Sequence, residues 1–426
     1  MATSSKAKQR VVFRDVRIFD GVSDNLVSGD VLIDGDRIVG VSESPVGDEP
    51  GRETVAVDGG GRVLMPGMSD AHVHLVGNAN TMVDMVAGSE SHIALNGLAE
   101  AGNMLLRGFT AVRDMAGDTG SLKSVIDRGL FPGPRIYPSQ AAISQTSGHG
   151  DFGFVYETPT ALGGAQSRAE QIGFMRVANG EAQVLASVRE QLKKGASQIK
   201  VMVGGGAASM YDPLYTVQFT DAELRAAVDA ATDYGTYVAT HVYNVTGIRR
   251  AVEAGVKSIE HGHLADEETI AMLAERGVWL SMQPFALGDH HYPDPDRAGK
   301  DREICTGTDQ VYEWATKHGV KVAWGTDLLL EPQLAARQSE MAARLGDHYS
   351  NLDALRMLTS GNAELFRLSG DRDPYRQAPF GVVAEGAWAD VLLVDGNPLE
   401  DLNLLADPGK NLSVIVKNGE IVKNGL

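Results

Sequence analysis

The sequence has little cysteine and no long hydrophobic run. Its single cysteine, Cys305, cannot form an internal disulfide bond or a thiolate cluster for a metal ion. No apolar stretch reaches the roughly 20 residues that span a bilayer. The N-terminal segment MATSSKAKQR is not followed by the apolar region of a signal peptide. We therefore expect a soluble, cytoplasmic protein without membrane partners.

Positive charge is scarce relative to negative charge. The 426 residues include 38 Lys and Arg against 56 Asp and Glu, which gives a formal net charge of -18 at pH 7. Nucleic acids and anionic membrane surfaces are bound through a basic surface that displaces counterions. The charge therefore argues against nucleic acid as a partner and favours a small-molecule substrate.

Both ends of the chain consist of short β-type segments separated by Gly-containing turns. Near the C-terminus, the Asn418-Gly419 dipeptide favours a two-residue hairpin turn. Neither end has enough strands to bury a face by itself. We therefore predict that residues 1–65 and 376–426 together form one small β-sandwich.

Between these ends, residues 66–375 alternate apolar β-type runs with amphipathic helical stretches such as 220–235 and 266–277. Eight strands are predicted, at residues 68–75, 109–115, 135–141, 198–203, 236–241, 257–261, 278–283 and 320–327. This pattern predicts an α/β fold of the (β/α)8 TIM barrel type. A doubly wound open sheet is the alternative, but its Gly-rich turn after the first strand is missing from the sequence.

Polar side chains end several of the predicted strands. In GMSDAHVHL, His72 and His74 share one face, because residues i and i+2 of a strand point the same way. His241, His261 and Asp327 end the predicted fifth, sixth and eighth strands. Barrel enzymes carry their catalytic residues at this rim. A pair of structural, hydrogen-bonded histidines is the alternative interpretation of the first motif.

Lys200 interrupts the apolar run SQIKVMVGGG of the predicted fourth strand. Ile199 and Val201 are expected to face the helices, which turns Lys200 inward. A buried ammonium group is costly to desolvate and tends to lose its proton. The neutral amine can then react with carbon dioxide to form a carbamate, an anionic ligand able to bridge two cations. A lysine paired with a carboxylate is the alternative.

Taken in order, these strand ends resemble the amidohydrolase superfamily over nearly the whole chain. The resemblance implies two divalent metal ions, most simply zinc, with manganese or cobalt suiting the same geometry. It implies six ligands: His72, His74 and Asp327 for one ion, His241 and His261 for the other, and carboxylated Lys200 between them.

The same resemblance implies the chemistry of the site. A water shared by two cations becomes a nucleophile near neutral pH. Asp327 is expected to carry its proton to the leaving nitrogen. Tyr243, on the face of His241, is the expected donor to the developing oxyanion. Aromatic packing at the rim is the alternative role for Tyr243.

Four strings narrow the resemblance to the imidazolonepropionase-related branch that contains Xaa-Pro dipeptidases and N-acyl amino acid hydrolases: ISQTSGHGD, THVYN, SIEHGH and GTDLL. Lys200 argues against the mononuclear deaminases of this branch. His149 is the expected substrate contact, with a structural hydrogen bond as the alternative. The segment 152–180 and the loop 288–300 leave the substrate open, because loops after strands shape the pocket.

The expected function is hydrolysis of an amide bond in a dipeptide of the Xaa-Pro type or in an N-acyl amino acid. A carbamate, urea or xenobiotic amide hydrolase is a second interpretation, and a non-catalytic metal-binding assembly protein is a third. The resemblance also implies a homo-oligomer, such as an octamer.

Other polar residues are expected to have structural roles. Arg113 and Asp114 are expected to support the rim through a buried ion pair. His290 and His291 are expected to be solvated in a polar loop. His263 shares the face of His261, but the Glu-His-Gly pattern of the family favours His261 as the ligand.

Overall fold

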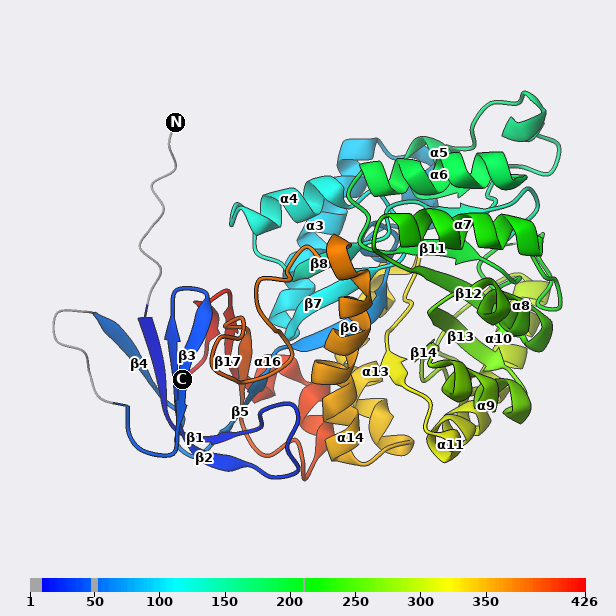
Figure 1. Ribbon diagram of the computed structural model, residues 1–426. Coiled ribbons are helices and arrows are strands. Elements are labelled where there is room, and N and C mark those ends of the chain that lie inside the picture. Colours follow the sequence, from blue (N-terminus) through cyan, green and yellow to red (C-terminus); the bar gives the residue numbers. More distant parts are fainter. Residues whose placement is uncertain (1–9, 47–52, 210) are drawn as a thin grey trace, which may run out of the picture.

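Strands from both ends of the chain join in one mixed sheet. The computed structural model describes residues 10–46, 53–209 and 211–426 (Figure 1). The sheet has the order β18-β17-β16-β5-β1-β2-β3, with β4 beside β1. Its strands are β1 (Arg10–Ile18), β2 (Val27–Asp34), β3 (Arg37–Ser42), β4 (Thr54–Asp58), β5 (Val63–Pro66), β16 (Val391–Val394), β17 (Leu412–Lys417) and β18 (Glu420–Asn424).

The two ends meet where β16 pairs antiparallel with β5, so that Val391 lies opposite Pro66 and Val394 opposite Val63. Buried side chains from both ends, including Phe13 and Leu393, form a common hydrophobic core. The pairing of the two ends is thus observed as one eight-stranded sheet. A two-layered sandwich stays a prediction.

The hairpin between β17 and β18 turns at the predicted dipeptide. Asn418 and Gly419 have φ angles of 52° and 75°. A turn with positive φ at both central residues matches the right-handed twist of the flanking strands, and Asn-Gly is the pair that tolerates it best. The predicted two-residue turn is confirmed.

The middle of the chain forms parallel strands in two groups, β6-β7-β8 and β10-β9-β11-β12-β13-β14-β15. Eight of these strands lie within or over the predicted segments: β6 (Met68–Val73), β7 (Phe109–Asp114), β8 (Arg135–Pro138), β11 (Ile199–Met202), β12 (Val238–Asn244), β13 (Ser258–Leu264), β14 (Trp279–Met282) and β15 (Val322–Trp324). Two short strands, β9 (Ala142–Ser144) and β10 (Met175–Val177), are additional. The predicted third strand extends too far, because the backbone turns at Gln140, where φ is 61°.

The two parallel sheets are hydrogen-bonded to each other at two places. The backbone amide of Asp327, just after β15, donates to the carbonyl of His72 in β6 at 2.8 Å. The amide of Ser197, just before β11, donates to the carbonyl of Pro138 in β8 at 2.7 Å. The carboxyl ends of strands from both sheets therefore face one common cavity.

Helices follow most of the parallel strands and cover their outer side (Figure 1). The helices of this middle part are α1 (Leu75–Asn78), α2 (Met82–Ala87), α3 (Glu90–Leu106), α4 (Gly120–Asp127), α5 (Arg168–Gln171), α6 (Glu181–Lys193), α7 (Asp221–Asp233), α8 (Val245–Ala254), α9 (Glu267–Arg276), α10 (Pro295–Thr306), α11 (Thr308–His318), α12 (Pro332–Ala335), α13 (Gln338–Ala343), α14 (Asn351–Arg356) and α15 (Asn362–Phe366). The short helix α16 (Pro408–Asn411) lies between β16 and β17.

Local sequence explains the helix limits. Thr220 and Glu223 form a capping box at the start of α7, in which each side chain hydrogen-bonds the backbone of the other residue. Asp266 caps the start of α9, and Gly277 ends it in the left-handed conformation. Within the described residues, no helix combines the length and the apolar character needed to cross a membrane.

Asn362, at the start of α15, provides a test of the contact between the two sheets. Its buried amide donates to the carbonyls of Ser69 and Trp324 and accepts from the amide of Trp324. We expect Asn362→Ala to destabilise the fold by about 3 kcal/mol, because it leaves buried backbone groups unpaired. For a chain of this length, that corresponds to a melting temperature lower by about 3 °C.

Calorimetry or circular dichroism measures this shift. Asn403→Ala is the matched control, since Asn403 is exposed and should tolerate the change. An equal melting temperature for Asn362→Ala and the parent would contradict this role.

Candidate metal centre

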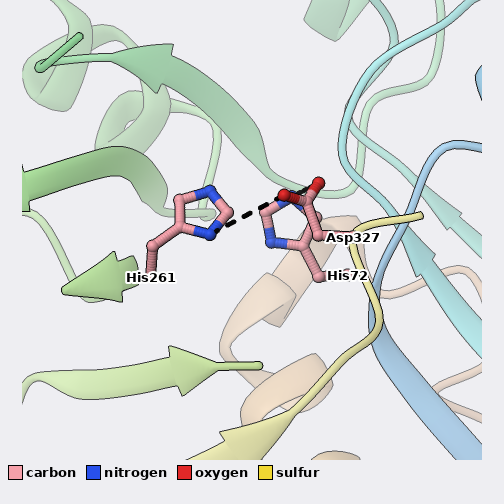
Figure 2. A group of neighbouring side chains, drawn as sticks. All are labelled: His72, His261 and Asp327. Carbon is pink, nitrogen blue, oxygen red and sulfur yellow. Dashed lines mark ion pairs between the residues drawn. The ribbon is translucent and has the colours of Figure 1, made fainter. Parts of the chain in front are cut away.

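Three of the predicted ligands form a tight group (Figure 2), and all three line the cavity. One nitrogen of His72, one nitrogen of His261 and one carboxylate oxygen of Asp327 all lie within 4.8 Å of one another. His72 Nε2 is 3.3 Å from Asp327 Oδ1, and His74 Nε2 is 3.0 Å from the same oxygen. Residues from β6, β13 and the end of β15 therefore converge on one point.

Lys200 lies beside this group, with its Nζ 3.2 Å from His72 Nε2. Its neighbours Ile199 and Val201 pack in the core on the helix side of β11, which confirms the predicted inward orientation. Burial lowers the pKa of Lys200 from 10.5 to about 8. The share of neutral amine near neutral pH is therefore much larger than for an exposed lysine.

His241 and Tyr243 complete the cluster from β12. The ring of His241 lies 4.5 Å from that of His261, and its Nε2 faces the carbonyl of Gly205 at 3.2 Å. The ring of Tyr243 stacks on His261 at 5.0 Å. The structure thus brings all six predicted ligands into one neighbourhood, with His241 outside the tightest group of three.

The protonation states of these side chains suit a divalent cation. Burial lowers the pKa of His261 to about 3 and that of His72 well below its usual value, so both imidazoles are neutral. Burial alone would raise the pKa of Asp327, but the neighbouring imidazoles, first His72 and then His261, hold it well below its usual value. Neutral imidazole and ionised carboxylate are the forms that coordinate metal ions such as zinc. The donor set fits a metal ion.

Glu260 contacts the predicted ligand His72, and sequence reasoning missed it. Its carboxylate lies 2.7 Å from Arg113 Nη2 and 2.9 Å from His72 Nδ1, and all three side chains are fully buried. Burial raises the pKa of Glu260, but the charge of Arg113 outweighs it and the net pKa is lowered. Because the ionised carboxylate can only accept, His72 donates through Nδ1 and leaves the Nε2 lone pair for a metal ion.

Arg113 and Asp114 were expected to support the rim through a buried ion pair, but of the two only Arg113 forms an ion pair with a described residue. Arg113 forms its buried ion pair with Glu260. Asp114 instead accepts a hydrogen bond from the backbone amide of Leu75, and burial raises its pKa well above its usual value.

Asp70, two residues before His72, was also missed. It accepts hydrogen bonds from the backbone amides of His72 and Thr326, the Thr326 hydroxyl and the Gln338 amide. Burial raises the pKa of Asp70 to about 6 despite these bonds. Its position on the same strand face as His72 and His74 is the signal that could have found it.

Two of the predicted ligands have strained backbone conformations. His261 has a φ angle of 78° and Asp327 one of 50°. Non-glycine residues rarely adopt this left-handed region, and such strain clusters at functional sites. The adjacent Gly262, with φ of 68°, continues the distortion at His261.

His149 lies above the cluster, with its ring stacked 4.0 Å from that of His241. Its Nδ1 is 2.6 Å from Asp212 and 2.8 Å from the Ser209 hydroxyl. A Cβ atom at Gly206 would come within 2.3 Å of the His149 ring. The glycine therefore lets the loop after β11 approach the ring closely.

His290 was expected to be solvated, and that expectation is wrong. Its side chain is 11% exposed and lines the cavity, with Nδ1 2.9 Å from Asp301 of α10. The hydrogen bond to Asp301 compensates for the cost of burying the polar ring of His290. The neighbouring His291 is exposed, as predicted. His263 is buried, with Nε2 3.0 Å from the carbonyl of Gln283, and it lies outside the group of three.

The cavity above the cluster has a volume of about 750 Å³, including its open mouth. The segment 152–180 supplies Phe152, Phe174 and Met175 to one wall, and the loop after β14 supplies Phe285 and Tyr292 to another. An apolar wall above a polar base is the usual form of a small-molecule site.

Comparison with known proteins identifies the family. The model of the amidohydrolase family matches residues 63–422. Ochratoxinase from Aspergillus niger is 32% identical over 381 residues, which cover 85% of this chain and 76% of that protein.

Solved structures of hydrolases are also similar to this chain. A prolidase complexed with N-methylphosphonate-L-proline is 34% identical, with a TM-score of 0.88 over 98% of this chain and 100% of that one. A Xaa-Pro dipeptidase with bound methionine in its active site is 26% identical, with a TM-score of 0.83 over 98% and 100%.

The chain therefore belongs to the amidohydrolase family, whose structures have the TIM-barrel type of α/β fold. Family members generally bind metal ions, and the residues at the cavity base fit that property. The chain is accordingly a hydrolase that acts on carbon–nitrogen bonds.

The contact between Glu260 and His72 generates a prediction about metal binding. Glu260→Gln keeps the size of the side chain but removes the charge that fixes the proton on His72 Nδ1. We expect metal affinity to fall about 10-fold to 100-fold.

Dialysis against buffered zinc, followed by elemental analysis, measures the affinity. Glu268→Gln, at an exposed residue of α9, is the matched control. Unchanged metal affinity in Glu260→Gln would show that Glu260 does not orient His72.

Proposed function

We propose that this chain is a dinuclear metal-dependent amidohydrolase that cleaves the amide bond of a dipeptide of the Xaa-Pro type or of an N-acyl amino acid. One observation carries the proposal. Six nitrogen and oxygen donors from strands far apart in the sequence converge at the base of one cavity. The prolidase and the Xaa-Pro dipeptidase among the similar structures support this class of substrate.

The donors divide between two metal positions. His72, His74 and Asp327 would hold one ion, with the Nε2 atoms of both histidines beside the Asp327 carboxylate. His241 and His261 would hold the second. Lys200, carboxylated on Nζ, would lie between them. When bound, two divalent cations, most simply zinc, would lower the pKa of a shared water and polarise the scissile carbonyl.

Asp327 and Tyr243 would handle protons and charge. The Asp327 carboxylate stays ionised at neutral pH and can accept a proton from the attacking water and deliver it to the leaving nitrogen. Burial raises the pKa of Tyr243 well above its usual value, so its hydroxyl stays protonated. It can donate to the oxyanion that forms as the carbonyl is attacked. His149, above His241, would contact the substrate.

A closed barrel, a second domain and a quaternary structure belong to the same proposal. We infer that the two parallel sheets, which are hydrogen-bonded to each other at two places, close into one (β/α)8 barrel of residues 66–375. Residues 1–65 and 376–426 form the second domain, and the chain acts as a homo-oligomer.

Lys200 is the residue whose replacement tests the proposal. We expect Lys200→Ala to lose at least half of the bound metal and more than 100-fold in kcat/KM, because the bridging ligand is removed. Elemental analysis measures the metal. A panel of Xaa-Pro dipeptides, N-acyl amino acids, carbamates and aryl ureas measures the activity.

The exposed Lys257 gives the control variant Lys257→Ala. A Lys200→Ala protein with full metal content and full activity would overturn the dinuclear site. A parent protein that cleaves carbamates or ureas but no amide would replace the proposed substrate class.

Tyr243→Phe tests the proposed oxyanion contact. Removing one donor to the oxyanion is expected to lower kcat about 100-fold, while KM changes little. Steady-state kinetics on the best amide of the panel gives both constants. Tyr234→Phe, at a half-exposed residue after α7, is the control. A change in KM with an unchanged kcat would indicate that Tyr243 packs against the substrate and does not donate to the oxyanion.

A further inference from the structure

Two imidazoles line the cavity wall in addition to the proposed metal ligands: His149 and His290. In both, Nδ1 is hydrogen-bonded to a buried or nearly buried aspartate, Asp212 for His149 and Asp301 for His290. Neither Nε2 atom hydrogen-bonds a described residue. Each ring is therefore fixed by a carboxylate and presents its second nitrogen to the cavity.

The two imidazoles occupy different parts of the cavity. His149 stacks directly on His241, beside the proposed metal ions. The ring of His290 lies beside Phe285, with 4.8 Å between ring centroids, and beside Tyr292, at 6.0 Å, and among the described residues it has no ring contact with a proposed metal ligand. His290 is thus placed to meet a part of the substrate that does not react.

The cavity has few other positive groups. Among its described lining residues, Lys200 is proposed as the bridging ligand and no arginine is present. The nearby Arg297 does not line the cavity, because its guanidinium lies over the Tyr292 ring and donates to the carbonyl of Ala207. An anionic group of a bound substrate, away from the metal ions, would therefore find its partner at His290.

The pairing partner of His290 is held rigidly. Asp301 belongs to α10, and the preceding Lys300 donates to the carbonyls of Gly206, Ser209 and Asp212 in the loop after β11. These hydrogen bonds connect α10 to the loop after β11. A side chain supported in this way presents its partner with a defined orientation.

The charges that face His290 favour its protonated form. Asp301, Asp327 and Asp289 are the acidic groups that act on it, while His263 and Tyr292 are its other titratable neighbours. Burial alone would lower the pKa of His290, but the contact with Asp301 outweighs burial and the net pKa is raised above 6.5. The imidazolium can then donate from Nε2 to an anion.

We propose that His290, oriented by Asp301, binds the free carboxylate of the substrate and so selects amides of carboxylate-bearing amino acids over their neutral analogues. This inference rests on the proposed amide hydrolysis and deepens it. Asp301 is a positioning residue, since it acts through His290.

Paired substrates test this role. N-acetyl-L-phenylalanine is compared with N-acetyl-L-phenylalaninamide, and Phe-Pro with Phe-prolinamide, by the release of acetate and of phenylalanine. The measured quantity is the ratio of kcat/KM for the acid to kcat/KM for the amide. We expect this ratio to fall at least tenfold in His290→Gln and in Asp301→Asn, through a higher KM for the acid.

His291→Gln is the matched control, because His291 is adjacent in sequence but exposed. An unchanged ratio in His290→Gln, or an equal fall in His291→Gln, would overturn the inference. Arg297→Gln separates the remaining alternative. A fall in the ratio there, with none in His290→Gln, would assign the carboxylate to Arg297.

The pH dependence adds a second measurement. The binding form is the imidazolium, so preference for the acid should be present below the raised pKa of His290 and decline as pH rises through it. Asp301→Asn removes the charge that raises this pKa, so the decline should move to lower pH. The same midpoint in both proteins would contradict the role of Asp301.

Equilibrium binding separates this inference from the proposed function. Calorimetry compares L-phenylalanine with L-phenylalaninamide on the zinc-loaded parent and on His290→Gln, and it requires no turnover. Weaker binding of the amino acid in His290→Gln, in a protein that cleaves no amide, would support His290 and overturn the proposed reaction. Amide cleavage without any His290-dependent binding or preference would do the reverse.

Discussion

The buried contact among Glu260, Arg113 and His72 is the interaction on which the site depends. The three side chains come from β13, β7 and β6, and none is exposed to solvent. A buried carboxylate without a partner would be costly, and Arg113 supplies that partner. The neutralised pair then holds His72 with Nδ1 as the donor. The Nε2 lone pair of His72 is therefore free for the proposed metal ion.

A second buried contact, made by Asp70, brings the proposed ligands of two strands together. Asp70 fixes the end of β15 next to β6 by accepting hydrogen bonds from Thr326. The following Asp327 lies within reach of His72 and His74. The strained φ angles of His261 and Asp327 persist because neighbouring strands hold both residues. Packing energy from the fold thus maintains a preorganised site.

The cavity wall combines apolar aromatic side chains with two oriented imidazoles. Aromatic side chains from two loops can accommodate an apolar substrate group, whereas His149 and His290 each present one ring nitrogen in a fixed direction. The carboxylates that orient them lie on separate elements, the loop after β11 and α10. Lys300 ties these two elements together, so the geometry of one wall depends on that of the other.

Local sequence determined the strands, several helix limits, the Asn418-Gly419 turn and the strand-end positions of the proposed ligands, because these follow from periodicity and turn chemistry. It missed Glu260, since regular alternation places Glu260 and His261 on opposite faces. The left-handed backbone at His261 breaks that alternation, and both residues contact or approach His72. The side-chain partners of His72 and His290 were decided only by the tertiary structure. An imidazole takes its orientation from whichever carboxylate lies beside it, and Glu260 is 188 residues from His72 in the chain.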